Sequence, residues 1–313
     1  MSKDLHSETS FSGHANPGGT VRDAQRLAAR TAEIGGGISV ARLLPTRQRR
    51  MIGAWCFLDH AGPATFAPGG GLRVGPHPHT CLQTFTWMLE GEILHHDSLG
   101  NEQMIRPGQV NLMTAGHGIA HTEESPAKET RAHAAQLWIA LPADSTDIAP
   151  AFDHYPELPR WQENGCQFTL LAGVHGGHTA PAKIYSPLIG MDLFSTQGAA
   201  LTLPLDHTFE YGILPLEGIT EVEGVSFAAD ELAYLASGYS ALPIKLAAGT
   251  RALLIGGQPF EDPITLWWNF VGRDKTYIAQ AQRDWESNSP RFGDVKGFAG
   301  PRLVAPNLPW ATT

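Results

Sequence analysis

Short runs of hydrophobic and β-branched residues, separated by turn residues, fill the first half of the chain. Turn residues separate these runs, as in Asp97-Ser-Leu-Gly-Asn101 and Pro107-Gly108, and they favour tight reversals of the chain between strands. Runs of this length and composition are typical of β-strands rather than helices. The pattern predicts an all-β unit with strands at residues 38–44, 55–59, 80–89, 92–96, 109–114 and 134–141.

A second series of strand-like runs follows a segment rich in proline and aspartate. That segment, residues 142–165, contains Pro142, Pro150, Pro156 and Pro159, so we place a domain junction there. The spacing of the later runs resembles that of the first unit, which indicates a second unit of similar architecture, although sequence self-similarity is weak. Its predicted strands are residues 167–172, 188–194, 200–203, 208–214, 231–235 and 251–255.

Two segments have helical character, one near each end of the chain. Residues 22–34 place Arg26, Arg30 and Glu33 on one polar side and end at a run of glycines, and residues 274–285 form the second candidate. The Pro- and Gly-rich tail after the second helix is typical of a segment that runs over a surface. We therefore expect a mobile polar N-terminal segment (1–37), a first β domain (38–145), a second β domain (146–265), and a C-terminal helix and tail (266–313).

Composition narrows the possible partners and compartments. The net charge of -9 argues against a nucleic-acid surface, because phosphate binding needs clustered Lys and Arg. Three widely separated cysteines fit reduced thiols better than a disulfide framework, and the polar N-terminus has no signal-peptide core. No hydrophobic run approaches membrane-spanning length. We expect a cytoplasmic protein that binds neither nucleic acid nor membrane.

Histidines gather in one part of the chain. Seven of the fourteen lie between positions 77 and 133. In a strand, residues i and i+2 point to the same face, so His77 and His79 form one pair and His121 and Glu123 another. Each pair alone is more often a surface or structural feature, but two pairs on neighbouring strands can converge on one ion. Four such ligands would close a tetrahedral zinc site, whereas an octahedral iron, manganese or nickel ion would keep two positions open.

Other histidines and one cysteine compete for the same role. Successive strand residues point oppositely, so at most one of His95 and His96 could face inward, and an outer or surface role is expected for both. His117 lies among glycines and is expected at the mouth of the site, and His133 is expected to be a hydrogen-bonded core residue. The Gly-rich loop that carries His175 and His178 is expected to be exposed. Cys81 shares the parity of His77 and His79 and would face the barrel interior as a buried, inert thiol, with a redox-sensitive thiol near the metal as the alternative.

The sequence resembles the pirin family of the cupin superfamily. The resemblance rests on His77-Pro-His79, Leu89-Glu-Gly-Glu-Ile, His96-Asp-Ser-Leu-Gly-Asn101, Ile105-Arg-Pro-Gly108 and Met113-Thr-Ala-Gly-His-Gly-Ile-Ala-His121-Thr-Glu123, with Gln136-Leu-Trp138, Ser186-Pro187 and Gly256-Gly-Gln-Pro259 in matching order. It covers roughly residues 38–290. It implies a bicupin, with two facing cupin β-barrels and a metal in the first alone. The implied ligands are His77, His79, His121 and Glu123. Iron(II) is the implied metal, with manganese, nickel, cobalt and zinc as alternatives.

The resemblance also implies an activity. Bacterial members resemble quercetin 2,3-dioxygenases, so the implied substrates are a small phenolic compound, a flavonol such as quercetin, and dioxygen, with Glu123 as the implied catalytic base. The alternative is a non-enzymatic, iron-binding redox sensor that acts through a protein partner. Two departures affect the site: Gln83 stands where the family usually has Glu, and His117 where Arg is common. Both positions are expected near the mouth of the site.

Overall fold

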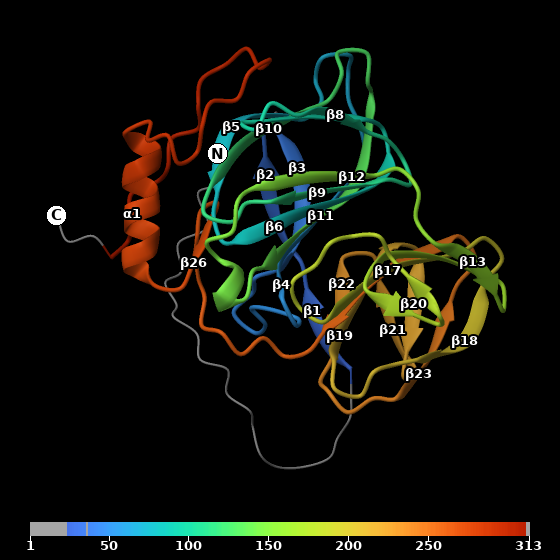
Figure 1. Ribbon diagram of the computed structural model, residues 1–313. Helices are drawn as coiled ribbons and strands as arrows, with labels where there is room; N and C mark the ends of the chain where they lie inside the picture. The colour runs from blue at the N-terminus through green and yellow to red at the C-terminus, as the bar shows by residue number, and fades with distance from the viewer. Residues whose placement is uncertain (1–23, 36, 311–313) are drawn as a thin grey trace.

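The computed structural model describes residues 24–35 and 37–310, and β-strands make up most of that part of the chain (Figure 1). Of the N-terminal segment expected to be mobile (1–37), residues 1–23 and 36 fall outside the described residues, whereas residues 25–28 and 30–34 form strands that pair with two sheets. The strands form two units, which we call the first and second barrel, each with one seven-stranded and one four-stranded sheet. The all-β class and the two-unit architecture predicted from the sequence are thus confirmed.

The first barrel holds the strands around the histidine-rich stretch. Its seven-stranded sheet has the order β12-β9-β6-β11-β4-β3-β2 and its four-stranded sheet the order β5-β10-β7-β8. The strands of the larger sheet are β2 (Arg30–Ile34), β3 (Ile38–Leu44), β4 (Trp55–Thr65), β6 (Leu82–Glu90), β9 (Val110–Thr114), β11 (Arg131–Ala140) and β12 (Ala151–Tyr155). Those of the smaller sheet are β5 (Arg73–His79), β7 (Ile93–Asp97), β8 (Glu102–Ile105) and β10 (Ile119–Glu124).

The second barrel repeats this division. Its larger sheet, in the order β1-β22-β19-β24-β17-β14-β13, contains β1 (Gln25–Ala28), β13 (Arg160–Glu163), β14 (Cys166–Ala172), β17 (Leu188–Ser195), β19 (Glu210–Glu217), β22 (Glu231–Leu235) and β24 (Thr250–Gly257). The smaller sheet, in the order β18-β23-β20-β21, contains β18 (Ala199–Pro204), β20 (Ile219–Val222), β21 (Val225–Ala228) and β23 (Ala241–Leu246). A short hairpin joins β15 (Val174–His175) to β16 (His178–Thr179).

The helix expected at residues 22–34 is wrong. Residues 25–34 form β1 and β2 instead; β1 pairs with β22 of the second barrel and β2 with β3 of the first. Exposed and less exposed residues alternate along β2, which is the period of a strand. Two sheet edges supply hydrogen bonds to this segment, and Leu27 is fully buried in the shared core, so tertiary contacts override the helical pattern. The strand β12, beyond the expected boundary at 145, belongs to the first sheet.

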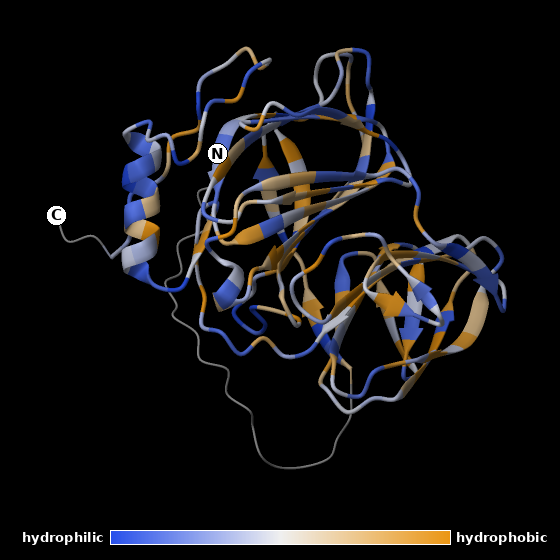
Figure 2. Cartoon of the chain, in the orientation of Figure 1, coloured by the Kyte–Doolittle hydropathy of each residue, from blue (hydrophilic) through white to orange (hydrophobic). Residues whose placement is uncertain are grey.

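The two barrels share one hydrophobic core. Trp55, Phe85 and Trp87 of the first barrel lie in the same buried cluster as Leu171, Leu253 and other residues of the second. The Trp55 indole donates to the carbonyl oxygens of Ile189 and Gly256, at 3.2 Å each. Hydrophobic positions are interleaved with polar ones along the strands of both barrels (Figure 2). This core fixes the larger sheets against each other and leaves the smaller sheets on the outside.

The C-terminal segment packs against the first barrel (Figure 1). It comprises the hairpin β25 (Thr265–Trp267) and β26 (Phe270–Gly272), then α1 (Lys275–Glu286), close to the helix predicted at 274–285. Asp274 caps this helix by accepting a hydrogen bond from the Tyr277 amide at 2.7 Å. A further 3-10 turn covers Ala143–Ser145. None of the described helices is long and apolar enough to cross a membrane.

The tail after α1 returns to the edge of the smaller sheet. The Leu303 amide donates to the carbonyl oxygen of Pro76 at 2.8 Å, and the Arg73 guanidinium donates to that of Ala299 at 2.6 Å. Pro76, which accepts the first of these hydrogen bonds, and Arg73, which donates the second, both lie on β5, an edge strand of the smaller sheet. The tail therefore runs over a surface, as expected, and covers the strand that carries two of the candidate ligands.

Candidate metal centre

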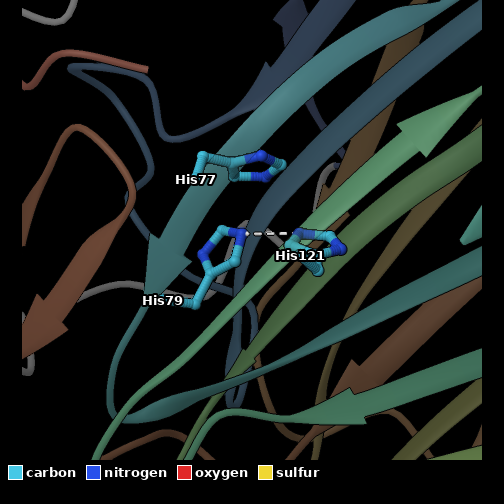
Figure 3. Close-up of side chains that lie close together, drawn as sticks. All are labelled: His77, His79 and His121. Atoms are coloured by element: carbon cyan, nitrogen blue, oxygen red, sulfur yellow. Dashed lines mark hydrogen bonds between the residues drawn. The ribbon is translucent and has the colours of Figure 1, made fainter. Parts of the chain in front are cut away.

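Three histidines converge between two neighbouring strands of the smaller sheet. His77 and His79 lie two positions apart on β5, and His121 lies opposite His77 on β10 (Figure 3). One nitrogen from each ring lies within 4.8 Å of the others, and all three side chains are buried. Within the described residues this is the one such group of three or more metal-ligating side chains. Strand parity and antiparallel pairing therefore place these three residues as the sequence predicted.

Two of the three imidazoles are held by a backbone acceptor on the side away from the cluster. Nδ1 of His77 lies 2.9 Å from the carbonyl oxygen of Gly75, and Nδ1 of His79 lies 2.9 Å from that of Asn269. A carbonyl oxygen can only accept, so both histidines carry their proton on Nδ1 and leave Nε2 bare when neutral. Nε2 of His79 lies 3.1 Å from Nε2 of His121. Hydrogen bonds from Nδ1 to a carbonyl oxygen, such as those of His77 and His79, fix the tautomer of metal-binding histidines.

The environment keeps the three rings neutral. Burial lowers the pKa of His77 to about 4, against a smaller opposing effect of the Gly75 carbonyl. Burial and the neighbouring histidines lower the pKa of His79 and His121 well below the usual range. A neutral imidazole is the form that binds a metal, so no proton has to be displaced at neutral pH.

This donor set fits a transition-metal ion. Neutral imidazole nitrogens suit zinc, copper, iron and nickel, and three such donors leave further coordination positions open for a ligand or substrate. The bare nitrogens face one another inside a buried space, where a cation between them would replace repulsion of lone pairs by coordination. His77, His79 and His121 are therefore the residues that could hold a metal.

Glu123 is not part of the group of converging donors. It follows His121 by two positions, but the pairing of β10 with β5 shifts register between these two residues. The side chain is partly buried and sits across from His95 on β7. Burial raises the pKa of Glu123 to about 7. Its role as a fourth ligand or as a base stays a prediction.

The histidines that competed for the site have other partners. His95 is buried directly behind His121, with Nδ1 atoms 3.4 Å apart, which agrees with an outer role rather than a surface one. His96 is also buried, and its Nε2 lies 3.7 Å from Glu102. His117 is exposed, and His133 is a buried residue whose Nε2 lies 2.8 Å from that of His60, as expected for a core histidine.

The loop with His175 and His178 is exposed at Val174, Gly176, Gly177 and Thr179, but the two histidine side chains are not exposed as expected. Both rings stack on Trp161, with centroids 6.2 and 4.3 Å from its ring, and are partly buried. The parity argument also fails for Cys81. The strand β5 ends at His79, and the backbone of Cys81 is left-handed at φ 54°. Its sulfur lies 3.9 Å from the carbonyl oxygen of Thr146, and burial raises the thiol pKa to about 11, so the thiol is inert.

Gln83 is fully buried and faces neighbours other than the three histidines. Its amide nitrogen donates to Thr114 Oγ1 and to the carbonyl oxygen of Lys183, both at 2.9 Å. Lys183 belongs to the second half of the chain, so Gln83 links the first barrel to a segment that precedes β17. Its amide oxygen has no hydrogen-bond partner. These contacts give Gln83 a structural role between the two halves.

Known proteins resemble the chain over most of its length. The Pirin family matches residues 37–139, and the Pirin C-terminal cupin domain matches residues 190–293. A Pseudomonas aeruginosa protein with the provisional name quercetin 2,3-dioxygenase PA1205 is 65% identical over 286 residues, covering 91% of each chain. A Caulobacter vibrioides pirin-like protein is 36% identical over 83% of this chain and 92% of its own.

A solved structure agrees with this relationship. The crystal structure of a quercetin 2,3-dioxygenase from Acinetobacter baumannii superimposes with a TM-score of 0.91 at 51% identity, covering 93% of this chain and 97% of that one. The two barrels, each with a larger and a smaller sheet, are thus cupin domains. The chain belongs to the pirin family and has its bicupin fold.

Proposed function

We propose that this protein is a metal-dependent dioxygenase that opens the ring of a flavonol such as quercetin. The observation that carries the proposal is the convergence of three neutral histidine nitrogens, within 4.8 Å of one another, in the first barrel. The names of the Pseudomonas and Acinetobacter relatives supply the substrate class. Iron(II) is the proposed metal, with manganese, nickel, cobalt and zinc as the alternatives to test.

His77, His79 and His121 would hold the ion through Nε2. A bound transition metal would supply a positive site for a deprotonated flavonol oxygen and a route for electrons to dioxygen. Burial of the three rings keeps bulk water away from the histidine nitrogens that would hold the ion. In the proposed reaction both atoms of dioxygen enter the ring-opened ester product, and one ring carbon leaves as carbon monoxide.

Glu123 is the proposed proton acceptor. Removal of the flavonol 3-hydroxyl proton needs a base near the metal, and a carboxylate is a common choice. Glu123 is two residues from His121 and is the carboxylate that strand parity predicts on the same face. We propose that its Oε atoms take this proton, either directly or after leaving the metal.

The test is turnover by protein loaded with one metal at a time under anaerobic conditions. Addition of quercetin and dioxygen should cause loss of flavonol absorbance and release of carbon monoxide in equal amounts. His79→Ala should abolish both signals, and Glu123→Ala should strongly reduce them. His96→Ala, which changes a buried histidine outside the cluster, is the matched control and should retain turnover. No turnover with any of the five metals would contradict the proposal.

A further inference from the structure

His95 lies behind one of the candidate ligands, outside the cluster itself. Its side chain is only 3% exposed, and its ring stacks on Phe152 of β12, with centroids 4.3 Å apart and an interplanar angle of 15°. Nδ1 faces Nδ1 of His121 at 3.4 Å, a long hydrogen bond, and Nε2 faces Oδ2 of Asp97 at 3.2 Å. Both ring nitrogens of His95 thus have a defined neighbour.

Asp97 is a rigid anchor for this ring. It is almost completely buried, and its Oδ1 accepts hydrogen bonds from the amides of Leu99 and Asn101 at 2.9 and 3.0 Å. The Asn101 side-chain amide donates to Oδ2 at 2.8 Å. Donors surround both carboxylate oxygens, as expected for an ionised aspartate at the start of a turn. The carboxylate is therefore an acceptor for His95.

The direction of each hydrogen bond follows from that anchor. Asp97 accepts, so His95 must donate from Nε2, and neutral His95 then has a bare Nδ1. A bare Nδ1 accepts, so His121 must donate from its own Nδ1. Neutral His121 is then bare at Nε2, which lies 3.1 Å from the equally bare Nε2 of His79. The opposite arrangement, in which His121 donates from Nε2 to His79, would require His95 to carry a proton on both ring nitrogens.

We infer that His95, anchored by Asp97, is a positioning residue that holds His121 in the tautomer with its proton on Nδ1 and its Nε2 free for the metal. The inference rests on the metal site of the proposed function. It gives His121 what the carbonyl oxygens of Gly75 and Asn269 give His77 and His79. All three histidines then present Nε2 to the metal. His77 and His79 are held by backbone carbonyl oxygens, whereas His121 is held by two side chains in sequence, His95 and then Asp97.

An isosteric pair of substitutions tests the hydrogen bond apart from packing. His95→Leu removes the acceptor. Asparagine has nearly the same shape as leucine, and His95→Asn places an amide oxygen near the position of Nδ1. His96→Leu removes the next histidine along β7 and serves as the matched control. The readout is the dissociation constant for cobalt(II), measured by chelator competition, with the absorption spectrum of bound cobalt(II) as a second signal.

We expect His95→Leu to bind cobalt(II) roughly 10- to 100-fold more weakly than the parent, the usual effect of removing the partner of a ligand histidine. His95→Asn should lose less, and His96→Leu should match the parent. Equal binding by His95→Leu and the parent would overturn the inference, and so would equal loss in the Leu and Asn variants. If the parent itself binds no cobalt(II), the metal site of the proposed function is wrong.

A measurement on the unmodified protein tests the tautomer directly. Long-range ¹H–¹⁵N correlation spectra of the metal-free protein at neutral pH distinguish histidines protonated on Nδ1 from those protonated on Nε2. The signal of His121, assigned with His121→Asn, should show the proton on Nδ1. A proton on Nε2 would overturn the inference whether or not the variants fold and whether or not the parent binds metal.

Discussion

Nδ1 of His79 donates to the carbonyl oxygen of Asn269, which lies 190 positions later in the sequence and only 2.9 Å away. Asn269 lies in the turn between β25 and β26, where Trp267 pairs with Phe270. The neighbouring Thr80 hydroxyl donates to the carbonyl oxygen of Val271 at 2.8 Å, so the whole hairpin is tied to the end of β5. The C-terminal segment thus orients a candidate metal ligand in the first barrel.

Loosening this hairpin should weaken metal binding. Phe270 is fully buried beside Trp267, Trp285 and Phe292. Phe270→Ala would leave a cavity, which for a buried phenylalanine costs about 3–5 kcal/mol of stability. Because the hairpin would no longer hold the Asn269 carbonyl in place, we expect a higher dissociation constant for cobalt(II) as well as a lower midpoint of thermal unfolding.

Phe227→Ala is the control for this prediction. Phe227 is an equally buried phenylalanine in the core of the second barrel. Phe227→Ala should lower the midpoint of thermal unfolding by a similar amount. It should leave the affinity for cobalt(II) unchanged at temperatures where the variant is folded. Equal affinity losses in both variants would show that the effect comes from global destabilisation.

The sequence predicts the three converging histidines, but it does not predict the groups that hold them in place. Strand parity finds His77, His79 and His121 because a period of two is visible in the sequence. The carbonyl oxygens of Gly75 and Asn269 belong to the backbone, so no residue type marks them. His95 could be placed only as an outer residue, because which of two successive histidines faces inward depends on register. The Asp97-Ser-Leu-Gly-Asn101 turn was the available signal for the anchor, but its link to His121 needs the pairing of β7 with β10.

The same limit explains the error near the N-terminus. Residues 22–34 have a plausible helical arrangement of Arg26, Arg30 and Glu33, and nothing local argues against it. The strands β1 and β2 form because two separate sheets offer free edges to this segment. A pairing between residues more than 200 positions apart, such as Arg26 with Ala233, leaves no trace in a single sequence.

The seam between the barrels contains a buried pair of histidines, His60 and His133. His133 lies 2.8 Å from His60, and carboxylates of the second barrel flank the pair: Asp230 is 2.7 Å from His60, and Glu217 is 3.6 Å from His133. Burial, then His60 and Arg251, lower the pKa of His133 to about 4. The unfolded chain therefore binds one more proton than the folded chain at this site between about pH 4 and 6.5.

This difference predicts a change in pH dependence. The contribution of His133 to stability is present above about pH 6.5 and is lost as the pH falls towards 4, with a slope of up to about 1.4 kcal/mol per pH unit. His133→Gln should lack that slope. Urea unfolding of both proteins between pH 4 and 7 should show that the free energy of unfolding falls less steeply with decreasing pH in the variant than in the parent. Parallel curves would contradict the assignment.

Gln83 gives a prediction about the departure from the usual family residue. Its amide nitrogen donates to Thr114 and to the Lys183 carbonyl, and the latter can only accept. Gln83→Glu would replace that donor by an oxygen and leave a buried carbonyl without a partner, which costs about 1–3 kcal/mol. We expect lower stability in urea unfolding at pH 7 and unchanged cobalt(II) affinity. An increase in stability would show that the glutamine side chain is oriented differently.

The metal content of the protein tests the central claim most directly. Purified protein loaded with iron(II) under anaerobic conditions and freed of excess metal should retain about one ion per chain by elemental analysis, since His77, His79 and His121 form one site. His79→Asn and His121→Asn should each lose most of it, whereas His96→Asn should keep the parental content. Iron content that is the same in all four proteins, or absent from the parent, would contradict the account.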